Sequence, residues 1–128
     1  MDGLNWTDVR DLARRVAHGE PFAFTESTRS ILRRTAPQVG IALSDAERAL
    51  QSEPTAEELL TEVSRRISNG SRRLSRTLAE VERCRDTGDV DGARQLLNDV
   101  LVVEVVPHYQ DILRANLAAL DGGGAARS

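Results

Sequence analysis

The sequence predicts an all-α protein: a single compact bundle of about five helices, two of them long and antiparallel. Two observations favour this fold class. Apolar residues recur at steps of three and four over most of the chain, which is the period of helices with one buried face. Glycines, prolines and capping residues fall between these periodic segments, where helices begin and end. Because 40% of the residues are hydrophobic but only 3% are aromatic, the core is expected to be mostly aliphatic.

The first two helices are expected before residue 37. Asn5 can cap the first, which should end at Gly19 and Pro21 because neither residue continues a helix well. Thr25 begins a second helical segment. This segment is expected to end before Pro37, whose ring disfavours a helical conformation in the residue that precedes it.

Two patterns of Ser or Thr followed three residues later by Glu mark the next helix starts. Ser44 to Glu47 matches a capping box and predicts a short helix that Pro54 closes. Thr55 to Glu58 repeats the pattern and predicts the start of a long helix.

The long helix is expected to carry one apolar stripe. Its members keep helical spacing: Leu60, Val63, Ile67, Leu74, Leu78 and Val81. Asn69 and Gly70 are poor helix formers, but the stripe keeps its phase across them, so the helix is expected to be continuous. Gly88 fits the position after a helix C-cap and Asp89 fits an N-cap, which predicts a tight turn into the last helix.

The valine-rich stretch DVLVVEVVPHY, residues 99–109, is predicted to be the middle of one buried helix of roughly 30 residues. Helical spacing continues on both sides and only Pro107 interrupts it, so a kink is expected there. Because apolar side chains lie on every side of this helix, we expect it to be buried on all sides. The alternative is a strand that pairs VLVVEVV with VGIAL or PFAF in a small sheet. One domain is expected over residues 1–121, followed by a flexible tail over 122–128.

Four blocks of the sequence stand out together: NWTDVRDLARRV, TRSILRRTA, NGSRRLS and GDVDGARQLLNDVLVVEVVPHY. Together they resemble the DUSAM domain, a family of myxobacterial paralogues without an assigned function. The resemblance covers about residues 5 to 120, and the last block is its most specific part. It implies a small bacterial all-helical domain, and the family offers no catalytic residues to transfer to this chain.

Composition excludes several classes of function. All 17 basic residues are arginine, which suits a GC-rich bacterial genome and excludes chemistry that needs a lysine, such as Walker A phosphate binding or a Schiff base. Cys84 is the single cysteine, and His18 and His108 belong to no metal or acid–base motif, so no catalytic residue, metal or cofactor is expected. No signal peptide or membrane-spanning segment is visible, so a cytoplasmic location is expected.

The clearest surface feature is a row of arginines on the long helix, with no acidic residue between Val63 and Ala79. At about 100° per residue they fall within an arc of roughly 120°, away from the apolar stripe. We call this set the arginine ridge: Arg65, Arg66, Arg72, Arg73 and Arg76. Guanidinium groups can bind phosphates or an acidic partner through paired hydrogen bonds, but the ridge can equally be a solvated face that pairs with neighbouring glutamates. A serine row is the second candidate surface, as a helix seam or a homodimer face: Ser64, Ser68, Ser71 and Ser75.

These observations predict a non-enzymatic helical protein-interaction or regulatory module, whose partner is another protein or a second copy of the chain. The alternative is a nucleic-acid-binding regulator that uses the arginine ridge. The net charge of −3 and the poor match of APQVGIALSDAERAL to a helix-turn-helix count against that alternative. An enzyme is the least expected class, and no small-molecule substrate is evident.

Overall fold

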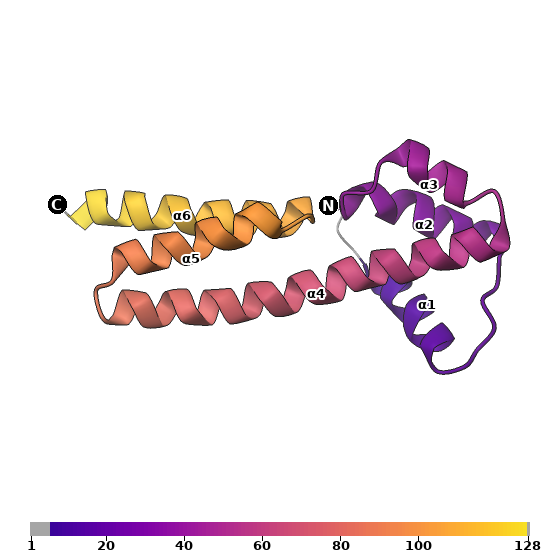
Figure 1. Ribbon diagram of the computed structural model, residues 1–128, viewed down its shortest axis with the longest axis horizontal. Helices are drawn as coiled ribbons and strands as arrows, with labels where there is room; N and C mark the ends of the chain where they lie inside the picture. Colours follow the sequence, from indigo (N-terminus) through magenta and orange to yellow (C-terminus); the bar gives the residue numbers. More distant parts are fainter. Residues whose placement is uncertain (1–5, 128) are drawn as a thin grey trace. The chain divides into compact units, whose positions relative to one another are not determined.

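The computed structural model describes residues 6–127, with side chains described as far as residue 122. Within these residues the chain forms helices and no strand (Figure 1). The helices are α1 (Thr7–Ala17), α2 (Glu26–Gln38), α3 (Leu43–Ala49), α4 (Glu53–Asp86), α5 (Val90–Val103) and α6 (Pro107–Arg127). The predicted all-α class is confirmed, and the strand alternative for the valine-rich stretch is wrong. The predicted Asn5 cap lies outside the described residues, and Trp6 occupies the N-cap position of α1.

The chain divides into two compact units, Met1–Ile67 and Ser68–Ser128. The first contains α1, α2, α3 and the beginning of α4, and the second contains the rest of α4 with α5 and α6. We call them unit 1 and unit 2 and describe each by itself. The expected single domain over 1–121 and the flexible tail over 122–128 stay predictions, although the α6 backbone is helical as far as Arg127.

Unit 1 packs three short helices with the first part of α4. Trp6 closes the start of α1 against α2, since its indole Nε1 donates to Gln38 Oε1 at 2.9 Å. Thr25 caps α2 by accepting a hydrogen bond from the Thr28 amide. The core is aliphatic, as predicted, and its most buried large side chains lie in the helices or directly after them: Val9, Leu32, Val39, Leu50, Leu60, Val63 and Ile67.

The predicted end of α2 before Pro37 is wrong, because the helix continues through Pro37 to Gln38. A proline in the last helical turn forgoes only one hydrogen bond, and the chain reverses immediately afterwards. Gly40 has a φ of +85° and the Ile41 amide returns to the Ala36 carbonyl at 3.0 Å, which is a glycine-terminated helix end. The segment from α2 to α3 is thus a helix–loop–helix corner.

Both predicted capping boxes are wrong. Ala42 is the N-cap of α3 and no side chain caps it, while Glu47 reaches across to Arg33, whose Nε lies 2.5 Å from Oε2. Because α4 already begins at Glu53, Pro54 lies in the first turn of α4 and does not close α3. The Thr55 hydroxyl, which was expected to cap α4, donates to the Ala49 carbonyl at 2.5 Å and ties α4 to the end of α3.

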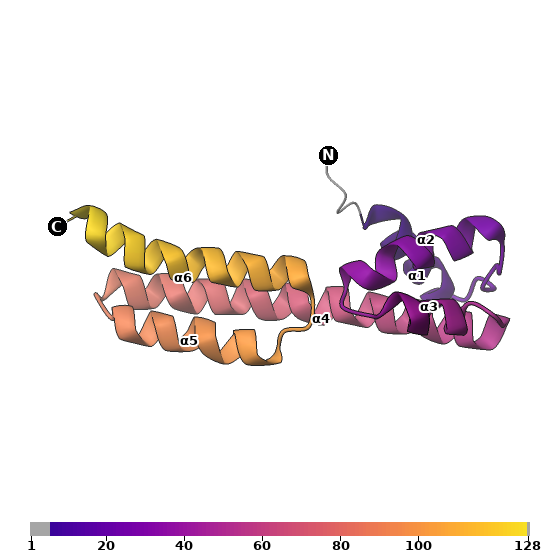
Figure 2. The ribbon, with the colours of Figure 1, turned by 90° about the horizontal axis from the view of Figure 1, so that it is seen from above.

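Unit 2 is an up-down-up bundle of the second part of α4, α5 and α6 (Figures 1 and 2). The predicted turn at Gly88 is confirmed: its φ is +79°, and the Asp89 carboxylate accepts the Gly92 amide at 2.9 Å as the cap of α5. The bundle core contains Val81, Ala93, Leu97, Leu113 and Leu120.

The predicted continuity of α4 through Asn69 and Gly70 is confirmed, and the structure supplies a reason for the glycine. A Cβ at Gly70 would lie 2.5 Å from Cδ2 of the Tyr109 ring, which is closer than packed atoms come. Tyr109 belongs to α6 and is 7% exposed. Gly70 therefore costs helix propensity but allows α6 to approach α4 closely within unit 2.

The prediction of one long kinked helix across Pro107 is wrong, because α5 ends at Val103 and α6 begins at Pro107 and packs back along α5. Pro107 is the first residue of α6, a position at which the missing amide hydrogen costs nothing. Val106 precedes it and accepts the Gln110 amide at 3.0 Å. Pro107 therefore begins α6 and does not kink a longer helix.

The prediction that the valine-rich stretch is buried all round is wrong as well. Val106 is fully buried, but Val102, Val103 and Val105 are 84%, 56% and 47% exposed. The reversal at Glu104 turns part of an apolar run outward, whereas a continuous helix would have needed neighbours on every side. We call these three exposed side chains the valine cluster.

Candidate interaction surfaces

The five guanidinium groups of the arginine ridge are not all free to bind a partner. Arg65 and Arg66 belong to unit 1 and the other three to unit 2. Both arginines of unit 1 pair with Glu62, and Arg66 also donates to the Val39 carbonyl at 3.0 Å. These pairs correspond to the alternative reading of the ridge, in which neighbouring glutamates neutralise it.

Arg73 belongs to a polar cluster that surrounds the buried Glu104 in unit 2. Its Nη1 lies 3.0 Å from Oε1 of Glu104, whose side chain is 1% exposed. The second carboxylate oxygen of Glu104 accepts the amides of Val105 and Val106 at 3.1 and 3.0 Å, and Gln110 Nε2 donates to the Glu104 carbonyl at 2.7 Å. Every polar group of the α5–α6 reversal named here thus has a partner, and the half-buried Arg73 is engaged with Glu104.

The two remaining ridge arginines are exposed. Arg72 donates to the side-chain oxygen of Asn69 at 2.6 Å, and Arg76 has no side-chain partner among the described residues. In the serine row only Ser75 is exposed, while the other three are half-buried. The structure therefore brings together neither the whole ridge nor the whole serine row as an open surface, and both sets stay predictions as binding sites.

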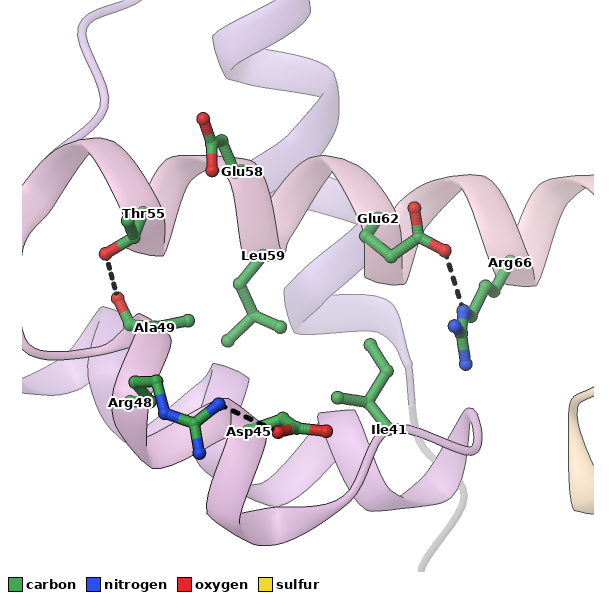
Figure 3. Close-up of a pocket in the computed structure, with 9 residues that line it drawn as sticks. All are labelled: Ile41, Asp45, Arg48, Ala49, Thr55, Glu58, Leu59, Glu62 and Arg66. Carbon is green, nitrogen blue, oxygen red and sulfur yellow. Dashed lines mark hydrogen bonds and ion pairs between the residues drawn. The ribbon is translucent and has the colours of Figure 1, made fainter.

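A recess lies in unit 1, between α3 and α4 (Figure 3). This recess, the α3–α4 groove, has a volume of about 390 Å³ and opens widely to solvent. Its lining residues come from the α2–α3 corner, α3 and α4: Ile41, Asp45, Arg48, Ala49, Thr55, Glu58, Leu59, Glu62 and Arg66. Figure 3 shows the side chains of Ile41, Ala49 and Leu59 turned toward one another between the two helices, where they form an apolar floor.

Charged residues border this floor, and most of them are already paired. Arg48 Nη1 lies 3.1 Å from the Asp45 carboxylate across one turn of α3, and Arg66 Nε lies 2.8 Å from Glu62. The hydrogen bond from Arg66, supported by Arg65, lowers the pKa of Glu62 against the opposing effect of its partial burial. Glu58 is the exception, because its exposed carboxylate has no partner among the described residues.

The chain around the groove is strongly acidic. Between residues 43 and 62 there is one arginine, Arg48, against six acids: Asp45, Glu47, Glu53, Glu57, Glu58 and Glu62. This excess is visible in the sequence, but the sequence does not show that part of it borders a groove. The apolar floor could not be predicted at all, since Ile41, Ala49 and Leu59 belong to three different elements.

Within the described part of the chain, these surfaces are accompanied by neither a cluster of metal-binding side chains nor a helix that could span a membrane. Among the described residues, no three His, Cys, Asp or Glu side chains are placed to hold a metal ion. Cys84 is half-buried against the core of unit 2. Within the same residues, no helix combines the length and apolarity needed to cross a bilayer.

Fold and surface together define an all-helical domain whose open, apolar-floored groove has charged edges. The chain belongs to the family described as "Protein of unknown function (DUF2379)", whose model matches residues 4–120. This match spans nearly the same residues as the resemblance seen in the sequence; the DUSAM assignment and the bacterial origin stay predictions. No curated protein and no solved structure matches the chain.

Proposed function

We propose that this chain is a non-enzymatic protein-interaction or regulatory module that binds a partner polypeptide in the α3–α4 groove. The observation that carries the proposal is the apolar floor of that groove, formed by Ile41, Ala49 and Leu59 and open to solvent. Surfaces that expose clustered apolar groups inside a polar border are typical of contact sites between proteins. The proposal includes the cytoplasmic location expected from the sequence.

The polar groups of the groove support a binding role over a chemical one. The Thr55 hydroxyl donates to the Ala49 carbonyl, and the carboxylates of Asp45 and Glu62 are held by arginines. The Thr55 hydroxyl also lies 2.6 Å from the Ser52 hydroxyl, but none of these groups pairs with a histidine, which is the usual base of an activated nucleophile. Apolar contact with the floor is the main interaction left for a ligand, and a wide shallow recess suits the side chains of a protein.

The valine cluster gives independent support. Three of the five large hydrophobic residues that the described chain exposes lie within it, at Val102, Val103 and Val105. An exposed group of this kind disfavours a protein that works alone in solution. It offers a second contact for a partner, or for another copy of the chain, in unit 2.

The proposal is tested by photo-crosslinking in the native host. p-Benzoylphenylalanine is placed at Ala49, in the groove, or at Ala79, an exposed position on α4 in unit 2. We expect a discrete protein adduct from position 49 that survives nuclease treatment and is missing from position 79. Adducts that are the same from both positions, or that nuclease abolishes, would contradict binding of a polypeptide in the groove.

The nucleic-acid alternative is tested with the arginines that the structure leaves exposed. Arg72→Gln and Arg76→Gln keep the buried Arg73–Glu104 pair, so a loss of binding would report on contact and not on folding. Tight binding of duplex or single-stranded nucleic acid, with a steep salt dependence that these two changes reduce, would replace the interaction proposal. Salt-independent or undetectable binding supports it.

A further inference from the structure

We infer that the α3–α4 groove binds a basic amphipathic helix of the partner protein. This inference rests on the proposed function and adds the chemistry of the partner. Three properties of the groove carry it: its length along α4, its apolar floor, and the negative sign of the one lining charge that remains unpaired.

The groove has the length of a short helix. Its lining runs along α4 from Thr55 to Arg66, a span of about 16 Å at the helical rise per residue. A partner helix of about three turns fits this span and brings two or three apolar side chains, at helical spacing, over one line. Figure 3 shows that Leu59 lies in the middle of this line, with Ala49 near one end and Ile41 toward the other.

The floor is shallow and aliphatic, which suits such side chains. Ala49 and Ile41 are half-buried and Leu59 is 6% exposed, so part of the floor is open to a ligand. The nearby Leu43, the first residue of α3, is 53% exposed and extends the apolar surface beside Ile41 in the chain. Leucine-sized side chains from a partner would cover this surface and exclude water from it.

The one unpaired charge that lines the groove is acidic. Arg48 and Arg66 are each paired with an acid, whereas the carboxylate of Glu58 has no partner among the described residues. The partial positive charge at the α4 N-terminus fades beyond the first turn, so Glu58 gains little from it.

The neighbouring charge on α4 strengthens the case for a basic partner of Glu58. Glu58 lies one helical turn before Glu62 on α4, and like charges at this spacing repel each other. Glu62 is neutralised by its two arginines, and Glu58, which lines the groove, is not. An arginine or lysine beside the apolar face of the bound helix would supply the missing partner for Glu58.

The experiment uses the full chain and three fluorescent helical peptides of about 15 residues. All three carry leucines at the same helical spacing, and their flanking positions are arginine, glutamine or glutamate. Binding is followed by fluorescence anisotropy at low and moderate salt. We expect the arginine peptide to bind at least about tenfold more tightly than the glutamate peptide, with the difference shrinking as salt rises.

Two pairs of variants locate the binding site. Glu58→Arg is compared with Glu82→Arg, since both are exposed, unpaired glutamates of α4 and only the first lines the groove. Ala49→Trp, which fills the groove, is compared with Ala79→Trp. We expect Glu58→Arg to weaken the arginine peptide about fivefold and to strengthen the glutamate peptide. Ala49→Trp should abolish binding, and the two control variants should bind as the wild type does; thermal melts confirm that all four are folded.

The outcomes separate this inference from the proposed function. Equal binding of all three peptides that Ala49→Trp abolishes would overturn the basic partner and keep the groove as a protein-binding site. No binding of any peptide, together with a protein adduct at position 49 in the host, would do the same. Binding of the arginine peptide that neither Ala49→Trp nor Glu58→Arg affects would place the contact elsewhere and overturn the inference.

Discussion

The α2–α3 corner and the α5–α6 corner both reverse the chain between packed helices, but they do so by different chemistry. At the first, Gly40 takes a left-handed conformation and backbone groups satisfy one another. At the second, the buried carboxylate of Glu104 binds two amides of the corner and pairs with Arg73. The first corner turns through its backbone geometry, with one added hydrogen bond from Arg66 to the Val39 carbonyl, whereas the second depends on the carboxylate of Glu104.

The two corners also differ in what their acids contribute. Glu47, near the α2–α3 corner, pairs with Arg33 where both side chains are well exposed, at 44% and 38%. Glu104 is 1% exposed and Arg73 is 31% exposed. Water therefore screens the first pair more strongly than the second, in which the carboxylate is buried. The contribution of an ion pair at a helix corner to stability therefore depends on its burial, and burial cannot be judged from sequence spacing.

The largest expected effect is that of Glu104→Ala. The change leaves Arg73 without its partner and the amides of Val105 and Val106 without an acceptor in a buried place. We expect a loss of about 3 kcal/mol in the free energy of unfolding, measured by urea denaturation followed by circular dichroism.

The matched control for this prediction is Glu47→Ala at the other corner. It removes an exposed partner of an exposed arginine, so the denaturation midpoint should hardly move. Equal losses for Glu104→Ala and Glu47→Ala would show that burial does not distinguish the two corners.

The second-largest expected effect is a difference between a buried and an exposed valine of the valine-rich stretch. Val106→Ala removes two methyl groups from a fully buried site and should cost about 2 kcal/mol, whereas Val102, at 84% exposure, should tolerate the same change with little effect. Both free energies come from the same denaturation assay. Comparable losses at the two positions would mean that the stretch is buried all round, as the continuous-helix prediction required.

Gly70→Ala tests the close approach of α6 to α4 in unit 2. Helix propensity alone predicts that alanine stabilises α4 by about 1 kcal/mol. Because the new Cβ would lie 2.5 Å from the buried Tyr109 ring, we expect a net loss of about 1 to 2 kcal/mol instead. Gly122→Ala in α6 is the control, since nothing lies within 4 Å of its Cβ and only the gain in propensity applies. A stabilised Gly70→Ala protein would exclude the tight contact.

Much of the fold could be predicted from the sequence where a residue acts through its own backbone. The apolar period gave the helical class, and Gly88 with Asp89 gave the α4–α5 turn, because those signals are local. Pro37 and Pro107 misled the prediction, since a proline breaks a helix interior but is tolerated in its first and last turns. Which position each proline occupies depends on contacts made elsewhere in the chain.

The candidate site was harder to predict for the same reason. Spacing along one helix predicts the arginine ridge. The Val39 carbonyl, which pairs with Arg66, and the Glu104 carboxylate, which pairs with Arg73, are distant in sequence. Glu104 was the one polar residue between Val100 and Pro107, which is the only signal that could have marked it. A charged residue inside an apolar run needs a buried partner, and the sequence does not say which arginine supplies it.

The smallest expected effect is a pH dependence from unit 1. The hydrogen bond from Arg66 lowers the pKa of Glu62 below its ordinary value of 4.5. A carboxylate with a lower pKa in the folded state stabilises the protein above its unfolded value, and this stabilisation is lost as the pH falls through the folded value. Stability should therefore decline below about pH 4.5, and Glu62→Gln should flatten part of that decline.

The measurement is the free energy of unfolding between pH 7 and pH 3. Since the Glu62 side chain is 32% exposed, the difference should stay under about 1 kcal/mol and shrink in high salt. A decline that Glu62→Gln leaves unchanged would assign the acid sensitivity to other carboxylates.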